Sequence, residues 1–222
     1  MLPRLVALLF VCCCAGQADA GAWLRDKGAS FNSTSFTSTH SLDTTSQTYL
    51  EYGLTSKTTI IADIGFLRPR YGPHGGYATL SIRRALGPTD RKSKWTYDVG
   101  IGANWAGDVV LPHIRTGLSW GRGIEITEKT GWIAVDAAVV WDLTYALHLG
   151  KIDTTVGINF TETTAGMVQL YSGYLNGDTF GTFAPSLVLS PKFTKFRIQI
   201  GTESEIGNLR NSAVKIGLWR DF

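Results

Sequence analysis

The feature that most constrains this chain is an alternation of apolar and polar residues that runs through nearly all of it. The clearest example is the run Y-D-V-G-I-G-A-N-W, which ends at Trp105 and is apolar at every second position. Successive side chains of a β-strand point to opposite faces, whereas an amphipathic helix needs apolar residues at i, i+3, i+4 and i+7. No long segment has that helical spacing, so the chain is predicted to be all-β.

Stretches with this alternation recur along the whole chain, and each has about the ten residues that a tilted strand needs to cross a bilayer. We predict strands at residues 29–38, 45–54, 58–66, 76–86, 94–105, 111–121, 131–142, 147–160, 164–174, 180–189, 193–202 and 212–222. Turn signals rich in Gly, Pro and Asn separate them, and the longer connections are expected at 67–75, 122–130 and 203–211. About twelve strands with short connections predict an up-and-down meander with both chain ends on one side.

A sheet this long would leave unpaired backbone groups at its edges, and closure into a barrel removes them. A soluble barrel turns its apolar face inward, whereas a membrane barrel turns it toward lipid and keeps a polar lumen. Aromatic residues at or near strand ends are typical of the membrane class, and the apolar face carries Phe66, Trp105, Trp120, Trp141, Phe160, Tyr174 and Phe222. We predict a closed antiparallel transmembrane β-barrel; the alternative is a secreted or periplasmic soluble β-protein.

The opposite face of the strands combines glycines with single charges of both signs. Charged residues predicted to face the lumen are Glu51, Asp63, Arg83, Asp98, Arg115, Asp136, Lys151, Asp153, Lys195, Arg197 and Lys215. A barrel of about twelve strands is too wide for apolar filling, yet narrow enough for side chains to constrict. These charges favour a small passive pore for polar solutes, in which they set the constriction and the selectivity. The alternative is that they pair across the lumen and leave a closed structural or interaction barrel.

The first twenty residues have the pattern of a secretory signal peptide. A basic residue, Arg4, precedes an apolar run over residues 5–14, and Ala18-Asp19-Ala20 forms a small-x-small cleavage site. The run falls short of the about 20 apolar residues of a transmembrane helix. We therefore predict cleavage after Ala20 and a single barrel domain over residues 21–222. All three cysteines lie in the cleaved part, so the domain is expected to have no disulfide and no thiolate metal site.

The end of the chain, S-A-V-K-I-G-L-W-R-D-F, places apolar residues at every second position and finishes on an aromatic residue. In this it resembles the assembly signal of Gram-negative outer-membrane β-barrel proteins, matched here by Val214, Ile216, Leu218 and Phe222. The resemblance implies a location in the cell outer membrane, contact with its lipid and lipopolysaccharide, and recognition of the last strand by the barrel-assembly machinery. Arg220 departs from the pattern because it falls on the apolar face, where a long cation can reach the membrane rim.

Enzymatic and cofactor chemistry find little support in the sequence. His40 and Ser41 are adjacent, so on a strand they would point to opposite faces, and His113 and Ser119 would be ~20 Å apart along one strand. We therefore predict no enzyme, with a barrel lipase or lipid A-modifying enzyme as the weakest alternative. No His or carboxylate cluster has metal-ligand spacing, so no metal or other cofactor is expected. The net charge of +3 is spread evenly, which argues against nucleic acid as a partner.

Overall fold

The structure is a computed structural model that describes residues 21–222, except for the side chains of residues 209–211. The predicted signal peptide, with the three cysteines, lies outside the described residues. The described chain forms β1 (Ser30–Thr39), β2 (Thr44–Thr55), β3 (Thr58–Arg68), β4 (Gly75–Ala85), β5 (Ser93–Ala106), β6 (Val109–Ile126), β7 (Lys129–Asp142), β8 (His148–Asn159), β9 (Thr164–Leu175), β10 (Asp178–Leu189), β11 (Phe196–Glu205) and β12 (Asn208–Asp221). It contains no helix long and apolar enough to cross a membrane.

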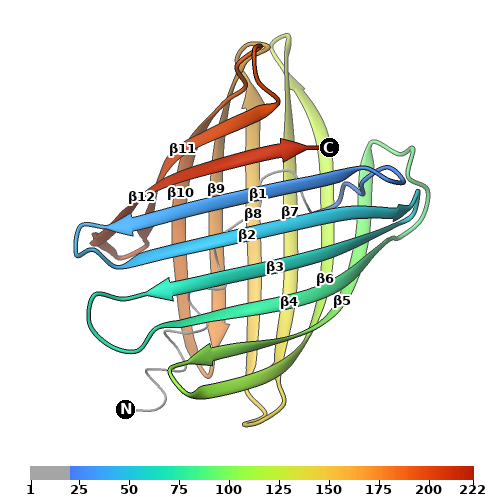
Figure 1. Ribbon diagram of the computed structural model, residues 1–222. Helices are drawn as coiled ribbons and strands as arrows, with labels where there is room; N and C mark the ends of the chain where they lie inside the picture. Colours follow the sequence, from blue (N-terminus) through green and yellow to red (C-terminus); the bar gives the residue numbers. More distant parts are fainter. Residues whose placement is uncertain (1–20) are drawn as a thin grey trace.

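Each strand pairs antiparallel with the next, and β1 pairs with β12 to close the barrel. At this seam the backbone N–H of Phe222 donates to the Ser30 carbonyl at 2.9 Å, and the N–H of Ser30 donates to the Phe222 carbonyl at 3.2 Å. Both ends of the barrel sequence therefore meet at one rim, called here the terminal rim. The strands are steeply inclined, and Figure 1 shows β1 to β4 crossing in front of β7 to β10, as closure of a sheet requires. The predicted closed meander is confirmed.

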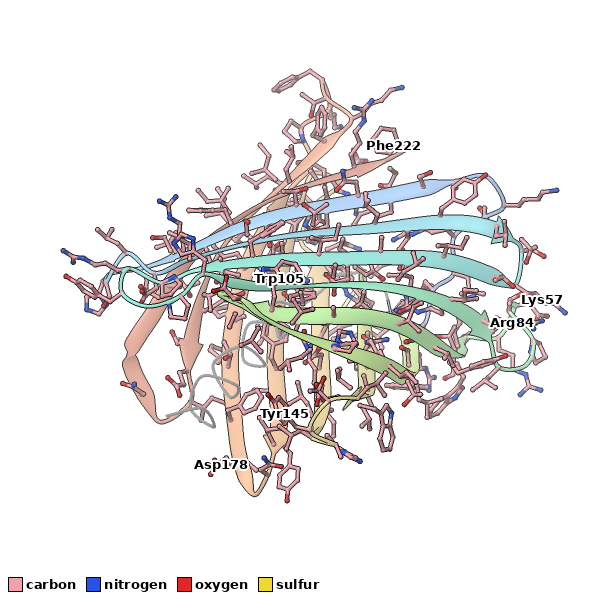
Figure 2. The ribbon with its side chains drawn as sticks, turned by 60° about the horizontal axis from the view of Figure 1, so that its bottom comes forward. Lys57, Arg84, Trp105, Tyr145, Asp178 and Phe222 are labelled. Atoms are coloured by element: carbon pink, nitrogen blue, oxygen red, sulfur yellow. The ribbon has the colours of Figure 1, made fainter. Side chains whose placement is uncertain are left out.

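The apolar face of the strands is the outer face of the barrel. Ile101 is 67% exposed, whereas Asp98, three residues earlier in β5 and on the opposite face, is 2% exposed. The terminal strand has the same polarity, with Ile216 exposed and Lys215 only 1% exposed. In Figure 2 side chains extend from the outside of the wall along all the strands in view, with Lys57 and Arg84 at the terminal rim. This is the polarity of a membrane barrel and the reverse of a soluble one.

Several glycines in the strands leave room for large side chains that cross the interior from a neighbouring strand. A Cβ atom on Gly157 would overlap the indole of Trp132, and one on Gly173 would overlap the ring of Phe180. Glycine within a strand commonly allows the strand to curve. The structure adds a second reason, which is space for side chains inside the barrel.

The predicted connection at residues 122–130 is wrong. β6 continues to Ile126 and β7 begins at Lys129, so only Thr127 and Glu128 form the turn. Both have positive φ angles, of 48° and 67°, as a two-residue hairpin turn requires. The polar residues that looked like a loop belong to two strands that extend beyond their neighbours at the terminal rim.

The predicted loop at residues 203–211 is also wrong. β11 continues to Glu205 and β12 begins at Asn208, so Ile206 and Gly207 form a tight turn in which Gly207 has a φ of 89°. No long segment remains there to fold into the lumen. The start of β11 shifts in the same direction, from the expected residue 193 to Phe196. Lys195, predicted to face the lumen, is therefore exposed in the turn before β11, because turn residues do not follow the alternation of a strand.

Candidate functional site

The interior of the barrel carries the predicted charges with the exception of Lys195. Side chains turned toward the lumen are Glu51, Asp63, Arg83, Asp98, Arg115, Asp136, Lys151, Asp153, Arg197 and Lys215. Arg197 lies at the terminal rim, where its Nη2 is 2.8 Å from Oδ2 of Asp221. Lys215 pairs with Glu203 at 2.9 Å, closer to the other rim. The remaining charges gather between these two pairs.

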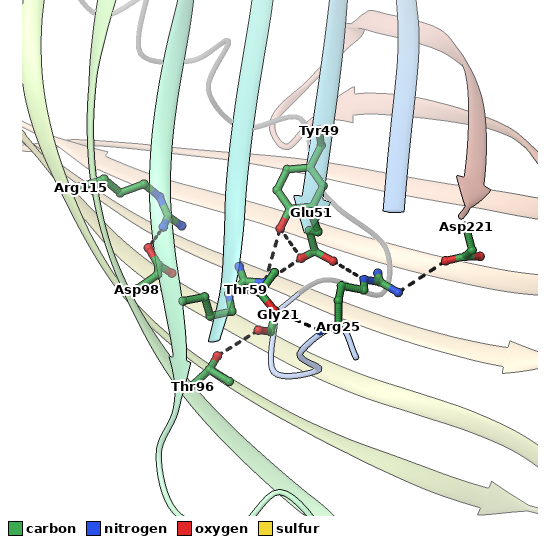
Figure 3. Close-up of polar contacts among 10 residues, drawn as sticks. Gly21, Arg25, Tyr49, Glu51, Thr59, Thr96, Asp98, Arg115 and Asp221 are labelled. Atoms are coloured by element: carbon green, nitrogen blue, oxygen red, sulfur yellow. Dashed lines mark hydrogen bonds and ion pairs between the residues drawn. The ribbon is translucent and has the colours of Figure 1, made fainter. Parts of the chain in front are cut away.

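One cluster is centred on Glu51 of β2. Its Oε1 accepts hydrogen bonds from the hydroxyl of Tyr49 at 2.6 Å and from Nη1 of Arg83 at 2.9 Å. Its Oε2 accepts one from Nε of Arg25 at 2.5 Å. Figure 3 shows Tyr49 and Arg25 directed at this carboxylate, and Arg83 reaches it from β4. Because the carboxylate is fully buried, it depends on these partners to offset the loss of water.

A second cluster continues around the lumen. Arg83 lies opposite Asp98 in the register of β4 and β5, and Asp98 forms an ion pair with Arg115 of β6. Gly117, which is opposite Asp98 on β6, makes room for this carboxylate, since a Cβ atom there would overlap it. Arg83 thus lies between two carboxylates, and Arg115 is already engaged by one of them.

Acidic side chains dominate the next part of the wall. Asp63 accepts hydrogen bonds from Nε2 of Gln47 at 2.9 Å and from the hydroxyl of Tyr77 at 3.0 Å. Asp136 and Asp153 face each other in the register of β7 and β8. Lys151 lies 4.0 Å from Asp153 on the same strand. The lumen therefore has cationic and acidic sectors side by side.

Only a small cavity remains between these sectors. Its volume is about 50 Å³, and its lining includes Asp63, Arg83, Arg115, Asp136 and Lys151. A space of this size holds on the order of one to three water molecules. At this depth side chains therefore constrict the lumen in this conformation.

Residues 21–27, called here the N-terminal segment, enter the lumen from the terminal rim (Figure 3). Ala22 is only 2% exposed, and the indole of Trp23 lies against Gly121. The backbone N–H of Arg25 donates to Oγ1 of Thr59 at 3.1 Å, and the hydroxyl of Thr96 donates to the carbonyl of Gly21 at 3.0 Å. Sequence reasoning missed this segment because it considered only strands. The available signal was the apolar run A-W-L before Arg25, in a stretch with no place in the sheet.

His113 contacts a hydroxyl and an amide from other strands. Its Nε2 lies 3.0 Å from Oγ1 of Thr79, and its Nδ1 lies 3.2 Å from Nδ2 of Asn104. The order of groups is that of a nucleophile, a base and an orienting residue. With the Asn104 amide donating to Nδ1, however, Nε2 is the protonated nitrogen, so it donates to Thr79 and does not accept its proton. The small cavity beside Thr79 also has no room for an acyl chain.

Among the described residues 21–222, no three His, Cys, Asp or Glu side chains lie close enough together to hold a metal ion. The charges of the lumen are arranged as ion pairs and hydrogen-bonded carboxylates. This arrangement can bind water, orient small polar molecules and exert an electrostatic field on a solute in the lumen.

Comparisons with known proteins identify the fold and no family. No protein-family model matches the chain, and no curated protein matches it. Among solved structures it is similar to the KdgM porin, with a TM-score of 0.60 and 8% identity over 86% of this chain and 99% of that one. It is also similar to an outer-membrane channel from Pseudomonas putida F1, with a TM-score of 0.53 and 10% identity over 94% and 100%. LpxR from Salmonella typhimurium has a TM-score of 0.56 and 7% identity over 86% and 99%. The shared feature is the fold of an outer-membrane β-barrel.

Proposed function

We propose that this barrel is a narrow passive pore of the bacterial outer membrane for small polar solutes. The observation that carries the proposal is the lumen itself, in which Asp63, Arg83, Arg115 and Lys151 surround a polar cavity in a wall that is apolar outside. Opposite charges facing a narrow passage set its ion selectivity and its limiting diameter. The likeness to a porin and to a channel supports the fold of such a pore.

Conductance of the purified, refolded protein in a planar bilayer tests this proposal. We expect discrete steps of low conductance, and a shift of the reversal potential toward cation selectivity in Arg115→Gln. Lys57→Gln, which removes a charge at the exposed end of a hairpin, is the matched control and should leave the reversal potential unchanged. Absence of open-channel steps at every voltage would contradict the pore.

The second candidate is a closed structural or interaction barrel. The ion pairs of Arg83 with Glu51, and of Arg115 with Asp98, favour it because the opposite charges neutralise one another along the lumen wall. The same bilayer recording separates the two functions, since a closed barrel inserts without conducting.

We also propose that the protein resides in the outer membrane, in contact with lipid and lipopolysaccharide, and that the barrel-assembly machinery reads Val214, Ile216, Leu218 and Phe222. All four side chains are exposed on the outer face of the last strand, where a partner can reach them. Deletion of Phe222 is expected to reduce the heat-modifiable form in outer-membrane fractions. An unchanged amount of folded protein there would contradict this recognition.

A further inference from the structure

Gly21 lies inside the barrel, against the side chain of Asp136. Its carbonyl accepts a hydrogen bond from Thr96 of β5, and a Cβ atom on Gly21 would overlap the Asp136 carboxylate. The two contacts place Gly21 at the same level of the wall, because Thr96 of β5 is opposite Ser119 of β6, which in turn is opposite Asp136 of β7. Contacts with two different strands, β5 and β7, therefore fix the position of Gly21 in the lumen.

Asp136 forms no close ion pair with a described side chain, although Ser119 hydrogen-bonds to its carboxyl group and the charges of Arg83 and Arg115 act on it from a greater distance. Its Oδ1 is buried and accepts no hydrogen bond from the described residues, and the residue opposite it on β8 is another acid, Asp153. Like charges directly opposite on neighbouring strands are destabilising. Arg83 and Arg115 form ion pairs with Glu51 and Asp98, and Lys151 lies 4.0 Å from Asp153. A buried carboxylate oxygen without a donor is costly, so this position calls for one further cation.

We propose that this cation is the α-ammonium group of Gly21, created when the signal peptide is removed after Ala20. Hydrolysis breaks the bond between the Ala20 carbonyl and the Gly21 nitrogen; water supplies the oxygen of the new Ala20 carboxylate, and the nitrogen becomes a protonated amine. The nitrogen is one bond from the Cα atom that lies against Asp136. Before cleavage it is a neutral amide with one N–H, and afterwards it has a positive charge and three donors.

The ion pair adds a charged attachment at the inner end of the N-terminal segment, where the Gly21 carbonyl already accepts a hydrogen bond from Thr96. Arg25 holds one end of the segment to Glu51 near the terminal rim, and the Gly21 ammonium holds the other end deeper in the lumen. Processing of the precursor and closure of the lumen are thus coupled through one buried charge. This inference concerns the folded interior and does not rest on conduction.

Reactivity of the α-amine tests the proposal in the full protein, exported as its precursor and purified from membranes in detergent. The intact mass first identifies the mature terminus, which must be Gly21. An amine-reactive N-hydroxysuccinimide ester near pH 7 then labels α-amines in preference to lysines, because α-amines have the lower pKa. Labelling of the N-terminal peptide is followed by mass spectrometry, for folded protein and for protein boiled in SDS.

We expect the folded wild type to react about tenfold or more slowly than the boiled protein, since reaction requires local opening. Asp136→Asn should remove most of that protection, whereas Asp153→Asn, a matched change directly across the strand pair, should retain it. Asp136→Ser replaces Asp136→Asn if the amide variant does not fold. A mature terminus other than Gly21, a wild type that reacts as fast folded as boiled, or equal rates in the Asp136 and Asp153 variants would overturn the proposal.

Discussion

At the scale of single residues, burial decides what an ion pair is worth. Glu51 and Arg83 are almost completely buried and 2.9 Å apart, whereas Lys192 and Glu162 form a pair of similar length, 2.8 Å, with side chains 75% and 84% exposed. Water screens the second pair and has little access to the first. Loss of one partner is therefore expected to affect stability more at the buried pair than at the exposed pair.

We predict that Arg83→Met lowers the free energy of unfolding by about 3 kcal/mol, because it leaves a buried carboxylate with fewer partners. Urea titration of protein folded into lipid vesicles measures this, and Lys192→Met, the matched control, should change it by less than about 0.5 kcal/mol. The double variant Glu51→Gln with Arg83→Met should lose less than the sum of the single losses. Equal effects of Arg83→Met and Lys192→Met would contradict the assignment of the buried pair.

The contact of His113 with Thr79 and Asn104 is predicted to be structural. We expect no hydrolysis of short-chain esters or phospholipids by the wild type, and therefore no difference between it and His113→Ala or Thr79→Val. Measurement of fluorogenic ester and phospholipid turnover checks this. Hydrolysis by the wild type that disappears in both variants would show that the protein is an enzyme.

At the scale of elements, the N-terminal segment stands apart from the strands because its residues bond to the lumen wall and not to a sheet edge. Its polar side-chain contacts with the barrel run through Thr59, Glu51, Thr96 and Asp221. A segment with so few contacts opens more readily than a strand paired on both sides. The half of the proposed pore at the terminal rim therefore has a removable part.

We predict that Arg25→Gln, and more strongly deletion of residues 21–27, increases single-channel conductance, because each loosens or removes chain from the lumen. Asp26→Asn, next to Arg25 but exposed and without a contact to Glu51 among the described residues, serves as the control and should conduct like the wild type. Conductance that is unchanged by the deletion would show that the segment does not limit passage, while absence of conductance in every variant would count against the pore itself.

At the scale of the whole molecule, the stability of the barrel in a membrane depends on its apolar outer band. Ile101 is 67% exposed near the middle of β5. We predict that Ile101→Lys destabilises the folded barrel by about 2–4 kcal/mol, the cost of a cation on the lipid face near the midplane. Phe193→Lys, in an exposed turn at the terminal rim, is the control and should have little effect. Urea titration in vesicles and heat-modifiability on gels report both, and a tolerated lysine at Ile101 would contradict the membrane-facing assignment.

The sequence by itself determined the strand pattern, the direction in which each face points and the closure of the sheet. These follow from a local rule, since neighbouring residues of a strand must point to opposite sides. The rule failed where strands end, at Lys195 and at the predicted loops 122–130 and 203–211. Near a rim, a strand can extend beyond the apolar band with polar residues, so a polar stretch no longer indicates where the strand ends.

Only the tertiary structure decided which interior groups meet. Arg83 reaches Glu51 across the whole of β3, His113 meets residues of two other strands, and residues 21–27 lie within the lumen. Such contacts depend on the register and curvature of the closed wall, which set distances between residues far apart in the chain. Alternation determines the face of the strand on which each side chain lies. The register and curvature of the closed barrel determine which other side chains it contacts.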